Sequence, residues 1–273
     1  MQRWLIAVAC LVVGGCAAAG TVRPDPSKPV DVVTEVLRLS GTREATQSLE
    51  GALRRVLTAL SGVETFRDPR VVAPIVDAAI TANRIFAGLA AHFEEHFDAE
   101  RLDRVVTLLR QPLSQRMVAL EVAAITAPPE TIVAWKRAQE STSEGRARFE
   151  LARRIDAAAG ATEATMGILY GAGRGAMRAF TDDSAPGARG PVEQLRAEMA
   201  KLEPETRAET VNALAYTYRD ASLDEIRRYA DLLETDLVRW FSRLQSAAAA
   251  RVSETLSEAA IRRLMDARRA PRV

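Results

Sequence analysis

Residues 92–96 read His-Phe-Glu-Glu-His, a segment whose residue types and spacing could bind a metal ion and activate water. The pattern H-x-x-E-H puts two histidines one helical turn apart, where they can hold zinc, and adds a glutamate that can polarise the zinc-bound water. His92 and His96 are the only two histidines in the sequence. The segment therefore predicts a zinc site of His92, Glu95 and His96, and with it a zinc-dependent hydrolase.

The same segment also has a purely structural interpretation. A zinc hydrolase needs a third ligand, and the acidic residues that could supply it stand in no diagnostic context; they are Glu121, Glu130, Glu140, Glu144 and Glu150. Phe93 and Phe97 flank the same turn and are expected to point to a hydrophobic core, which places the histidines at the edge of that core. A short motif without its context is weak, so zinc is the alternative and no cofactor is the main expectation.

Cysteine placement and charge exclude several other classes of protein. The two cysteines, Cys10 and Cys16, both lie close to the N-terminus, which excludes a disulfide scaffold and zinc sites built from four cysteines or from two cysteines and two histidines. The sequence has no G-x-S-x-G, so a serine nucleophile of that type has no support. A net charge of +1 with 27% charged residues argues against intrinsic disorder and against a dedicated nucleic-acid surface.

The N-terminal residues have the features of an export signal that ends at a lipid-modified cysteine. Residues 1–3 supply a positive end, residues 4–13 form an apolar run too short to span a bilayer, and two glycines precede Cys16. The sequence Val13-Gly14-Gly15-Cys16 resembles the lipobox of bacterial lipoproteins, in which the cysteine thiol accepts a diacylglyceryl group. The alternative is an ordinary secretory signal cleaved near residues 17–19, which are also small.

The lipoprotein resemblance implies a location. Cleavage before Cys16 would remove residues 1–15 as a signal peptide and leave a mature chain with an acylated end, and two or more acyl chains hold a protein stably on a membrane. Ala17 is not acidic, which by the sorting convention of the lipoprotein family implies the outer membrane, with the protein facing the periplasm. Residues 16–30 contain three prolines and are expected to form an extended tether.

The remaining sequence predicts an all-α fold. Apolar residues recur at three- and four-residue spacing from residue 49 to residue 60, and Asp68–Pro69 is expected to open one helix that continues to Phe97. Glycine is absent from residues 191–273 and proline from residues 205–270, so nothing interrupts long helices there. No segment alternates apolar and polar residues over strand length with turn residues at its ends.

An internal repeat divides the helical part of the chain. A shift of 124 residues aligns two sets of apolar positions, which are Leu102, Val105, Leu109, Leu113 and Met117 in the first copy and Ile226, Tyr229, Leu233, Leu237 and Phe241 in the second. Asp98 and Ser222 are expected N-caps, and each copy is interrupted at the same place, by Gln111–Pro112 or Thr235–Asp236. We therefore expect a helical bundle built from two related helical hairpins, with a coincidence of amphipathic helices as the alternative.

These features predict five segments: a signal peptide (1–15), a tether (16–30), a first helical repeat domain (31–127), a central helical segment and loop (128–190) and a second helical repeat (191–273). The central segment contains Gly167, Gly171, Gly173 and Gly175. Glycines at four-residue spacing on a helix let another backbone approach closely. Tight helix packing is therefore expected there, and a mobile ligand-gating helix is the alternative.

Several of these residues resemble a known family. Residues 93–102, Phe-Glu-Glu-His-Phe-Asp-Ala-Glu-Arg-Leu, and residues 110–115, Arg-Gln-Pro-Leu-Ser-Gln, are similar to the proteobacterial envelope domain catalogued as domain of unknown function 2059. That family usually has serine and glycine where this chain has Gln111 and Ser114. Residues 36–41 resemble its opening helix, and residues 216–241 a diverged second copy. The resemblance implies helix caps and core positions, and it names no chemistry.

Two groups of basic residues complete the candidate sites. The stretch from Trp135 to Arg154 alternates basic residues with glutamates and is expected to form a solvated helix face; its basic residues are Lys136, Arg137, Arg146, Arg148, Arg153 and Arg154. The second group is Arg262, Arg263, Arg268 and Arg269. Positive residues suit a helix C-terminus, and the alternative is a patch that binds an anionic envelope component.

The sequence as a whole predicts a lipid-anchored helical envelope protein that binds a partner or supports an assembly, without catalysis. Its expected partners are the membrane, through the anchor, and another envelope protein or an anionic envelope component; nucleic acid is not expected. A zinc-dependent hydrolase that uses residues 92–96 is the first alternative. An apolar-ligand or lipid carrier is the second, and it predicts a cavity between the two repeats.

Overall fold

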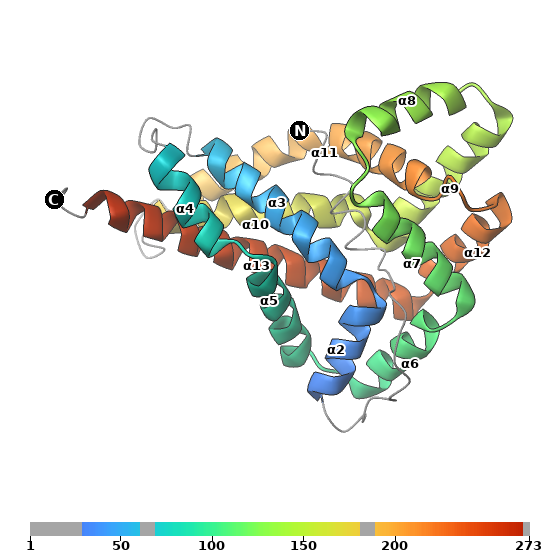
Figure 1. Cartoon of the computed structure of the whole chain (residues 1–273), viewed down its shortest axis with the longest axis horizontal. Coiled ribbons are helices and arrows are strands. Elements are labelled where there is room, and N and C mark those ends of the chain that lie inside the picture. Colours follow the sequence, from blue (N-terminus) through green and yellow to red (C-terminus); the bar gives the residue numbers. More distant parts are fainter. Residues whose placement is uncertain (1–28, 61–68, 181–188, 270–273) are drawn as a thin grey trace.

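The computed structural model describes residues 29–60, 69–180 and 189–269, and all regular secondary structure in these ranges is α-helical (Figure 1). The helices are α2 (Pro29–Leu39), α3 (Thr42–Leu60), α4 (Pro69–Ala79), α5 (Ala82–Glu95), α6 (Ala99–Leu109), α7 (Pro112–Ala124), α8 (Pro129–Gln139), α9 (Ser143–Ala159), α10 (Ala161–Phe180), α11 (Arg189–Thr217), α12 (Leu223–Leu233) and α13 (Asp236–Arg269). The predicted all-α bundle is confirmed.

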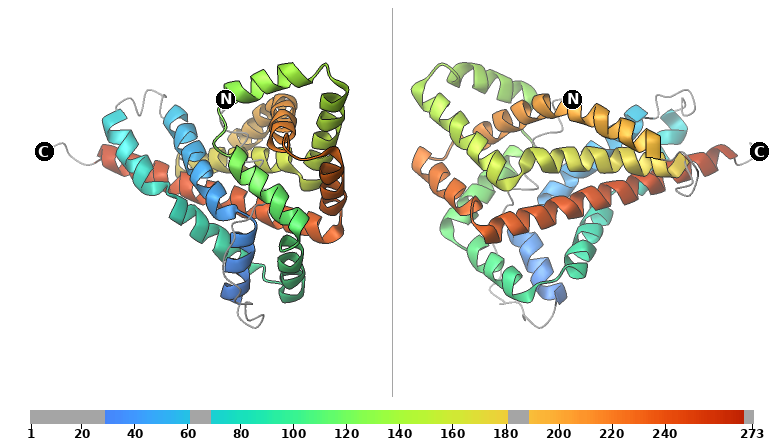
Figure 2. Two further views of the ribbon diagram at one scale, coloured as in Figure 1. Left: turned by 45° about the vertical axis from the view of Figure 1, so that its right-hand side comes forward. Right: turned by 180° about the vertical axis from the view of Figure 1, so that it is seen from behind.

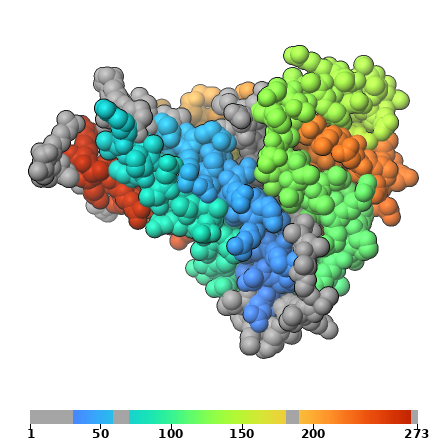
Figure 3. Space-filling model, viewed as in Figure 1, coloured from blue at the N-terminus to red at the C-terminus, as the bar shows by residue number. Residues whose placement is uncertain are grey.

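Three long helices form the centre of the bundle. Seen from behind, α10, α11 and α13 lie side by side, with α10 between the other two (Figure 2). On the opposite face, α3 to α5 and α7 to α9 occupy different ends of the molecule (Figure 3). The long helices therefore connect two groups of shorter ones.

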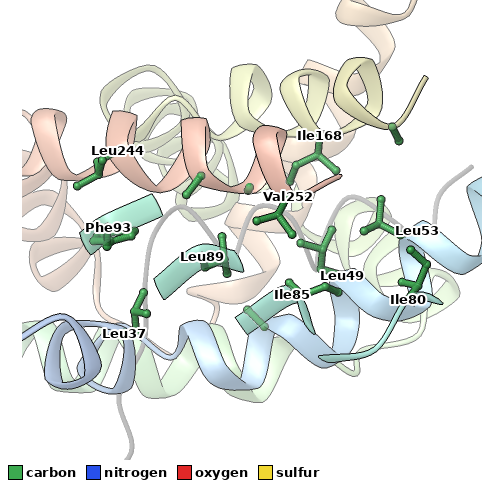
Figure 4. Close-up of a cluster of buried hydrophobic side chains, with 14 of the residues drawn as sticks. Leu37, Leu49, Leu53, Ile80, Ile85, Leu89, Phe93, Ile168, Leu244 and Val252 are labelled. Carbon is green, nitrogen blue, oxygen red and sulfur yellow. The ribbon is translucent and has the colours of Figure 1, made fainter. Parts of the chain in front are cut away.

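The larger hydrophobic core joins the first part of the chain to the last. Side chains of α2, α3 and α5 meet Ile168 of α10 and Leu244 and Val252 of α13 (Figure 4). Phe93 packs edge to face on Phe241, with ring centroids 5.9 Å apart. A second core lies among α7, α9, α11 and α12. Both cores thus draw on residues that are far apart in the sequence.

The two repeated hairpins have matching boundaries. Helices α6 and α12 are each 11 residues long and begin 124 residues apart, and α7 and α13 begin with the same offset. The residues that end α6 and α12, Arg110 and Glu234, have nearly identical backbone angles of φ −78°, ψ −8° and φ −76°, ψ −8°. The two related hairpins are therefore confirmed. They differ in length, because α7 has 13 residues and α13 has 34.

Side-chain caps begin α6 and α12. The carboxylate of Asp98 accepts the backbone N–H of Arg101 at 3.0 Å. Ser222 and Glu225 form a capping box, in which each side chain accepts the backbone N–H of the other residue, at 3.2 and 2.9 Å. A cap of this kind typically contributes about 1 kcal/mol to stability. Both expected N-caps are confirmed.

One predicted helix is divided in two. The expectation of a single helix over residues 69–97 is wrong, because the chain breaks between α4 and α5. Thr81 has an extended backbone and caps α5 by accepting the N–H of Arg84 at 3.3 Å. Arg54 of α3 stabilises the break between the two helices, because its guanidinium group donates to the carbonyl oxygen of Ile80 at 3.0 Å. The apolar pattern continues at helical spacing through residues 69–97 and predicts one helix. The cap at Thr81 and the contact from Arg54 nevertheless end one helix and begin another there.

The glycine-containing helix α10 packs closely on α13. A Cβ added at Gly171 would lie 3.2 Å from the carbonyl carbon of Ala250, and one at Gly175 would lie 2.9 Å from the carbonyl carbon of Glu254. Backbone atoms of α13 already occupy this space, so only glycine fits at these two positions. Gly173 faces α11 instead. The predicted tight helix packing is therefore confirmed.

A buried carboxylate lies in the same interface. The side chain of Glu254 is 5% exposed and accepts hydrogen bonds from Arg174 and Arg178, which are one turn apart on α10. Burial alone would raise the pKa of Glu254, but the two guanidinium groups outweigh burial and hold the pKa below its ordinary value. The α10–α13 contact is thus both close and charge-paired.

Parts of the described chain are apolar enough to cross a membrane by length and composition alone. These are residues 70–95, and α7 with α8 if the bent pair is taken as one span. The core helices of soluble proteins pass the same test, and one face of α5 is buried by Ile85, Leu89 and Phe93. Of the most apolar window within residues 70–95, 28% is buried in the structure, so core packing accounts for only part of its apolar character.

Candidate functional site

The predicted metal ligands lie together at the C-terminal end of α5. One donor atom from each of His92, Glu95 and His96 lies within 4.8 Å of the donor atoms of the other two. The imidazole rings of the two histidines face each other, with centroids 4.2 Å apart. Residues three and four positions apart share one face at a helix end, so the local helix brings these three side chains into one cluster.

The cluster lies at the surface of the described part of the chain. Glu95 and His96 are exposed, His92 is half-buried, and none of the three lines either of the two cavities described below. Enzymes of this kind hold their substrates in concave pockets. The acids considered as a third ligand lie elsewhere: Glu121 is on α7, and Glu130, Glu140, Glu144 and Glu150 belong to α8, α9 and the turn between them.

A cleft of about 730 Å³ opens between α8, α9 and α11. Its volume lies in the range of small-molecule binding sites. Its lining consists of the apolar residues Phe149, Pro204, Ala208 and Val211, the charged residues Lys136, Glu140, Arg146, Glu150, Arg153, Asp156 and Arg207, and Asn212. Sequence reasoning missed this cleft because its walls come from three helices. The only signal in the sequence was the alternation of charges between residues 135 and 154.

The charged side chains at the rim of the cleft are paired with one another. Lys136 and Glu140 are 3.1 Å apart, and Arg153 and Glu150 are 2.5 Å apart. Arg146 donates to a backbone carbonyl of the turn before α9 at 2.7 Å. Exposed ion pairs of this kind contribute about 0–1 kcal/mol. A binding partner could therefore exchange its own charges for them at little cost in stability.

A buried carboxylate lies at the floor of the cleft. Asp156 accepts the backbone N–H and the hydroxyl of Thr162 at 2.8 and 2.9 Å, and a guanidinium N–H of Arg207 at 3.1 Å. Thr162 is in the first turn of α10, so Asp156 also caps that helix. Burial has the largest influence on the pKa of Asp156 and raises it, although the hydrogen bonds from Thr162 and the charge of Arg207 oppose this.

The expectation of a solvated face from Trp135 to Arg154 holds only in part. It is wrong for Arg148, which is buried and donates to the carbonyl oxygens of Tyr218 and Ala221 at 2.6 and 2.9 Å. Arg154 donates to Asp231 of α12 and to Glu234, which follows that helix, at 2.6 Å each. The guanidinium group of Arg148 therefore satisfies backbone acceptors in the turn between α11 and α12, a role that charge alternation along one helix cannot reveal.

Glu121 of α7 is a fully buried carboxyl group beside the second repeat. The hydroxyls of Tyr218 and Tyr229 donate to its Oε1 at 2.5 and 3.1 Å. Burial raises the pKa of Glu121 well above its ordinary value, and the two tyrosine hydrogen bonds oppose this only in part. Sequence reasoning considered Glu121 only as a third zinc ligand, whereas it lies in a different core from the residues around Phe93.

A small cavity lies between the two repeats. It has a volume of about 20 Å³ and is lined by residues of α6, α7, α12 and the start of α13, including the buried Ser114 and Ser242. One water molecule needs about 10–15 Å³ measured in this way, and ligand pockets have several hundred. The lipid-carrier alternative predicts a cavity here, and the cavity present has room for one water molecule.

The remaining predicted site residues are at the two ends of the chain. Cys16, with the whole expected signal peptide, lies outside the described residues. Arg262 donates to Glu258 on its own helix at 2.8 Å. Arg263 and Arg268 are exposed, and Arg269 ends α13.

Comparison with known proteins found no significantly similar protein. No protein-family model matches the chain, and no curated protein and no solved structure is significantly similar to it. The resemblance to domain of unknown function 2059 therefore rests on the residues quoted above alone.

Proposed function

We propose that this chain is a lipid-anchored helical protein of the bacterial cell envelope, held on the outer membrane through Cys16 and facing the periplasm. We further propose that it binds another envelope protein and catalyses no reaction. The observation that carries the proposal is the sequence Val13-Gly14-Gly15-Cys16 at the end of a short apolar run. Each buried acyl methylene contributes about 0.8 kcal/mol, so two or more chains on one cysteine suffice for stable attachment.

The distance between the proposed anchor and the helices limits where the protein works. Helix α2 begins at Pro29, and only residues 17–28 separate it from Cys16. A chain of that length spans at most about 45 Å. The start of α2 would therefore stay within that distance of the membrane surface, and other envelope proteins are partners that the bundle can reach there.

The cleft between α8, α9 and α11 supports binding of a protein segment. Its apolar wall, which includes Phe149, Pro204 and Val211, can bury an apolar side chain, and the rim offers charges of both signs. An apolar centre with a polar rim is the usual anatomy of a protein-binding surface. A catalytic site would need groups that converge on one reacting atom. In this cleft Lys136, Glu140, Glu150, Arg153, Asp156 and Arg207 are held in ion pairs, and Arg146 donates to a backbone carbonyl.

The zinc-dependent hydrolase is the second candidate function. The cluster of His92, Glu95 and His96 favours it, because all three side chains meet. Their exposure, and their absence from the lining of both described cavities, make hydrolysis the weaker candidate, because enzymes of this kind hold their substrates in concave pockets. We therefore rank hydrolysis below binding.

Replacing Cys16 by alanine tests the anchor. We expect the wild-type protein to sediment with outer membranes and to carry the mass of attached acyl chains. The Cys16→Ala variant should lose both the added mass and the association with outer membranes, because without the thiol no acyl chains are attached. Membrane fractionation and intact-mass measurement check this, with Cys10→Ala as the matched control that should behave like wild type. A Cys16→Ala protein of unchanged mass and distribution would contradict the proposal.

A photo-crosslinking amino acid placed in the cleft tests partner binding. At Ala208, an exposed residue of the cleft wall, we expect a discrete heavier adduct in intact cells, and at Ala87, an exposed residue of α5, none. Reversing charge at the rim by Arg153→Glu should weaken the Ala208 adduct. Arg137→Glu, on α8 outside the cleft lining, should not. Equal adducts from both crosslinking positions, or an adduct indifferent to Arg153→Glu, would count against the cleft as the binding site.

A further inference from the structure

The cluster at the end of α5 has a donor set that suits a particular class of metal ion. Two imidazole nitrogens and one carboxylate oxygen are ligands for zinc, copper and nickel, whereas magnesium and calcium prefer sites built from oxygen alone. Zinc binds such donors at about 2.0–2.2 Å. The donor atoms of His92, Glu95 and His96 lie within 4.8 Å of one another, and they have to draw closer around an ion. The exposure of Glu95 and His96 leaves their side chains room for that movement.

A backbone contact fixes which nitrogen of His96 is available. The Nδ1 atom of His96 lies 2.9 Å from the carbonyl oxygen of His92. A carbonyl oxygen can only accept, so Nδ1 carries the proton and donates. The lone pair is then on Nε2. Metal-binding histidines typically donate their second nitrogen in this way, which sets both the tautomer and the ring orientation.

The core holds the helix turn that carries the cluster. Phe93, between the two histidines, is fully buried and lies against α13 (Figure 4). Its ring packs on the ring of Phe241. His96 ends α5, and its backbone N–H still bonds to the carbonyl of His92 at 3.2 Å. The backbone positions of the three donors are therefore fixed before an ion arrives, which reduces the entropy lost on binding.

The charges around His92 are of both signs. The carboxylate of Glu95 belongs to the cluster and offsets part of the charge that a cation would bring. Arg251 of α13, the basic neighbour of His92, is exposed to solvent.

We propose that His92, Glu95 and His96 form a surface site for one divalent transition-metal ion, with zinc as the reference ion and with at least one coordination position open to water or to a partner. The proposal concerns binding of the metal ion alone, and it holds whether or not the bound ion catalyses hydrolysis. It goes beyond the proposed function and does not depend on it, since neither the lipid anchor nor the cleft contributes a ligand.

Zinc titration of the detergent-extracted full-length protein, in competition with a chromogenic chelator, tests this site. We expect one ion per chain, with affinity at least 10-fold weaker in His92→Ala and in His96→Ala. Glu95→Gln should weaken binding about 3- to 10-fold, and Glu94→Gln, an exposed neighbour outside the cluster, should match wild type. Circular dichroism verifies that each variant keeps its helices.

Cobalt provides an independent measurement on the same samples. Cobalt bound to two imidazoles and a carboxylate at low coordination number gives intense visible absorption, and this band should disappear in His92→Ala with His96→Ala. Magnesium in excess should not displace it. No binding by the wild-type protein, or binding that the two alanine variants retain in full, would overturn the proposal. Either result would leave the anchor and the cleft untouched, because those are tested by fractionation and crosslinking.

Discussion

Replacing Gly175 by alanine is expected to lower the free energy of unfolding by about 3 kcal/mol. The added Cβ would overlap the carbonyl oxygen of Glu254 and lie 2.9 Å from its carbonyl carbon and 3.0 Å from the amide nitrogen of Glu258. These are backbone atoms of a 34-residue helix, so they cannot move aside as a flexible side chain would. Helices α10 and α13 must separate, and the core on both sides of them loses contact. Urea denaturation followed by circular dichroism measures the change.

The same helix provides the control. At Gly167 an added Cβ would meet only the Cβ of Ala250, at 3.6 Å, which is an ordinary contact. Alanine favours a helix over glycine by about 1 kcal/mol, so Gly167→Ala should leave stability unchanged or raise it. The two glycine-to-alanine substitutions are therefore expected to act in opposite directions. Similar gains from both would mean that helix propensity, and not the distance between backbones, controls stability here.

The glycines show how far the sequence alone could lead. Their four-residue spacing predicts a close helix contact, and the contact is present at Gly171 and Gly175. The spacing does not identify the partner helix, which is α13, or show that Gly173 faces α11. A row of glycines on one helix face predicts that the backbone of another segment packs closely against it. The identity of the approaching helix depends on the packing of the whole chain.

Helix boundaries were predictable from the sequence where the helix itself contains a cap residue or belongs to the repeat. The caps Asp98 and Ser222 and the 124-residue repeat correctly place α6 and α12. The break at Thr81 was missed, because a threonine inside an apolar pattern signals a cap only when contacts such as Arg54 to Ile80 support it. Hydrogen bonds from polar side chains to other helices, such as the one from Arg54 to Ile80, help to determine where a helix ends. The apolar periodicity of a single segment does not reveal them.

The candidate sites also differ in how far the sequence could predict them. His92, Glu95 and His96 are neighbours in sequence, so local helix geometry alone brings them together. The cleft needs α8, α9 and α11, and the whole of α10 separates α11 from α9 along the chain. Arg148 looked like one of several solvated arginines, although its guanidinium group binds the backbone carbonyls of Tyr218 and Ala221, in a distant part of the sequence. Sequence reasoning therefore found the local cluster and missed the site that is built from distant segments.

Replacing Glu121 by glutamine is expected to change how stability depends on pH. Burial raises the pKa of Glu121 in the folded protein well above its ordinary value of 4.5. The folded protein keeps this proton at pH values where the unfolded chain releases it, so unfolding becomes easier as the pH rises. The loss amounts to at most about 1.4 kcal/mol per pH unit, from the unfolded pKa upward until the folded pKa is reached. Glutamine cannot ionise, and its carbonyl oxygen can still accept from Tyr218 and Tyr229.

Denaturant unfolding of wild type and Glu121→Gln at pH 5, 6, 7 and 8 measures this effect. The variant should gain stability relative to wild type as the pH rises, and the two should converge toward acid pH, where Glu121 is protonated in both states. Asp156, whose pKa is also raised, is present in both proteins and cancels in the difference. Glu130→Gln, at an exposed position of α8, should follow the wild-type curve. A difference that shrinks as the pH rises would mean that the tyrosine hydroxyls hold Glu121 as a carboxylate, with its pKa lowered. The contact between α7 and the second repeat would then contain a buried negative charge instead of a neutral carboxyl group.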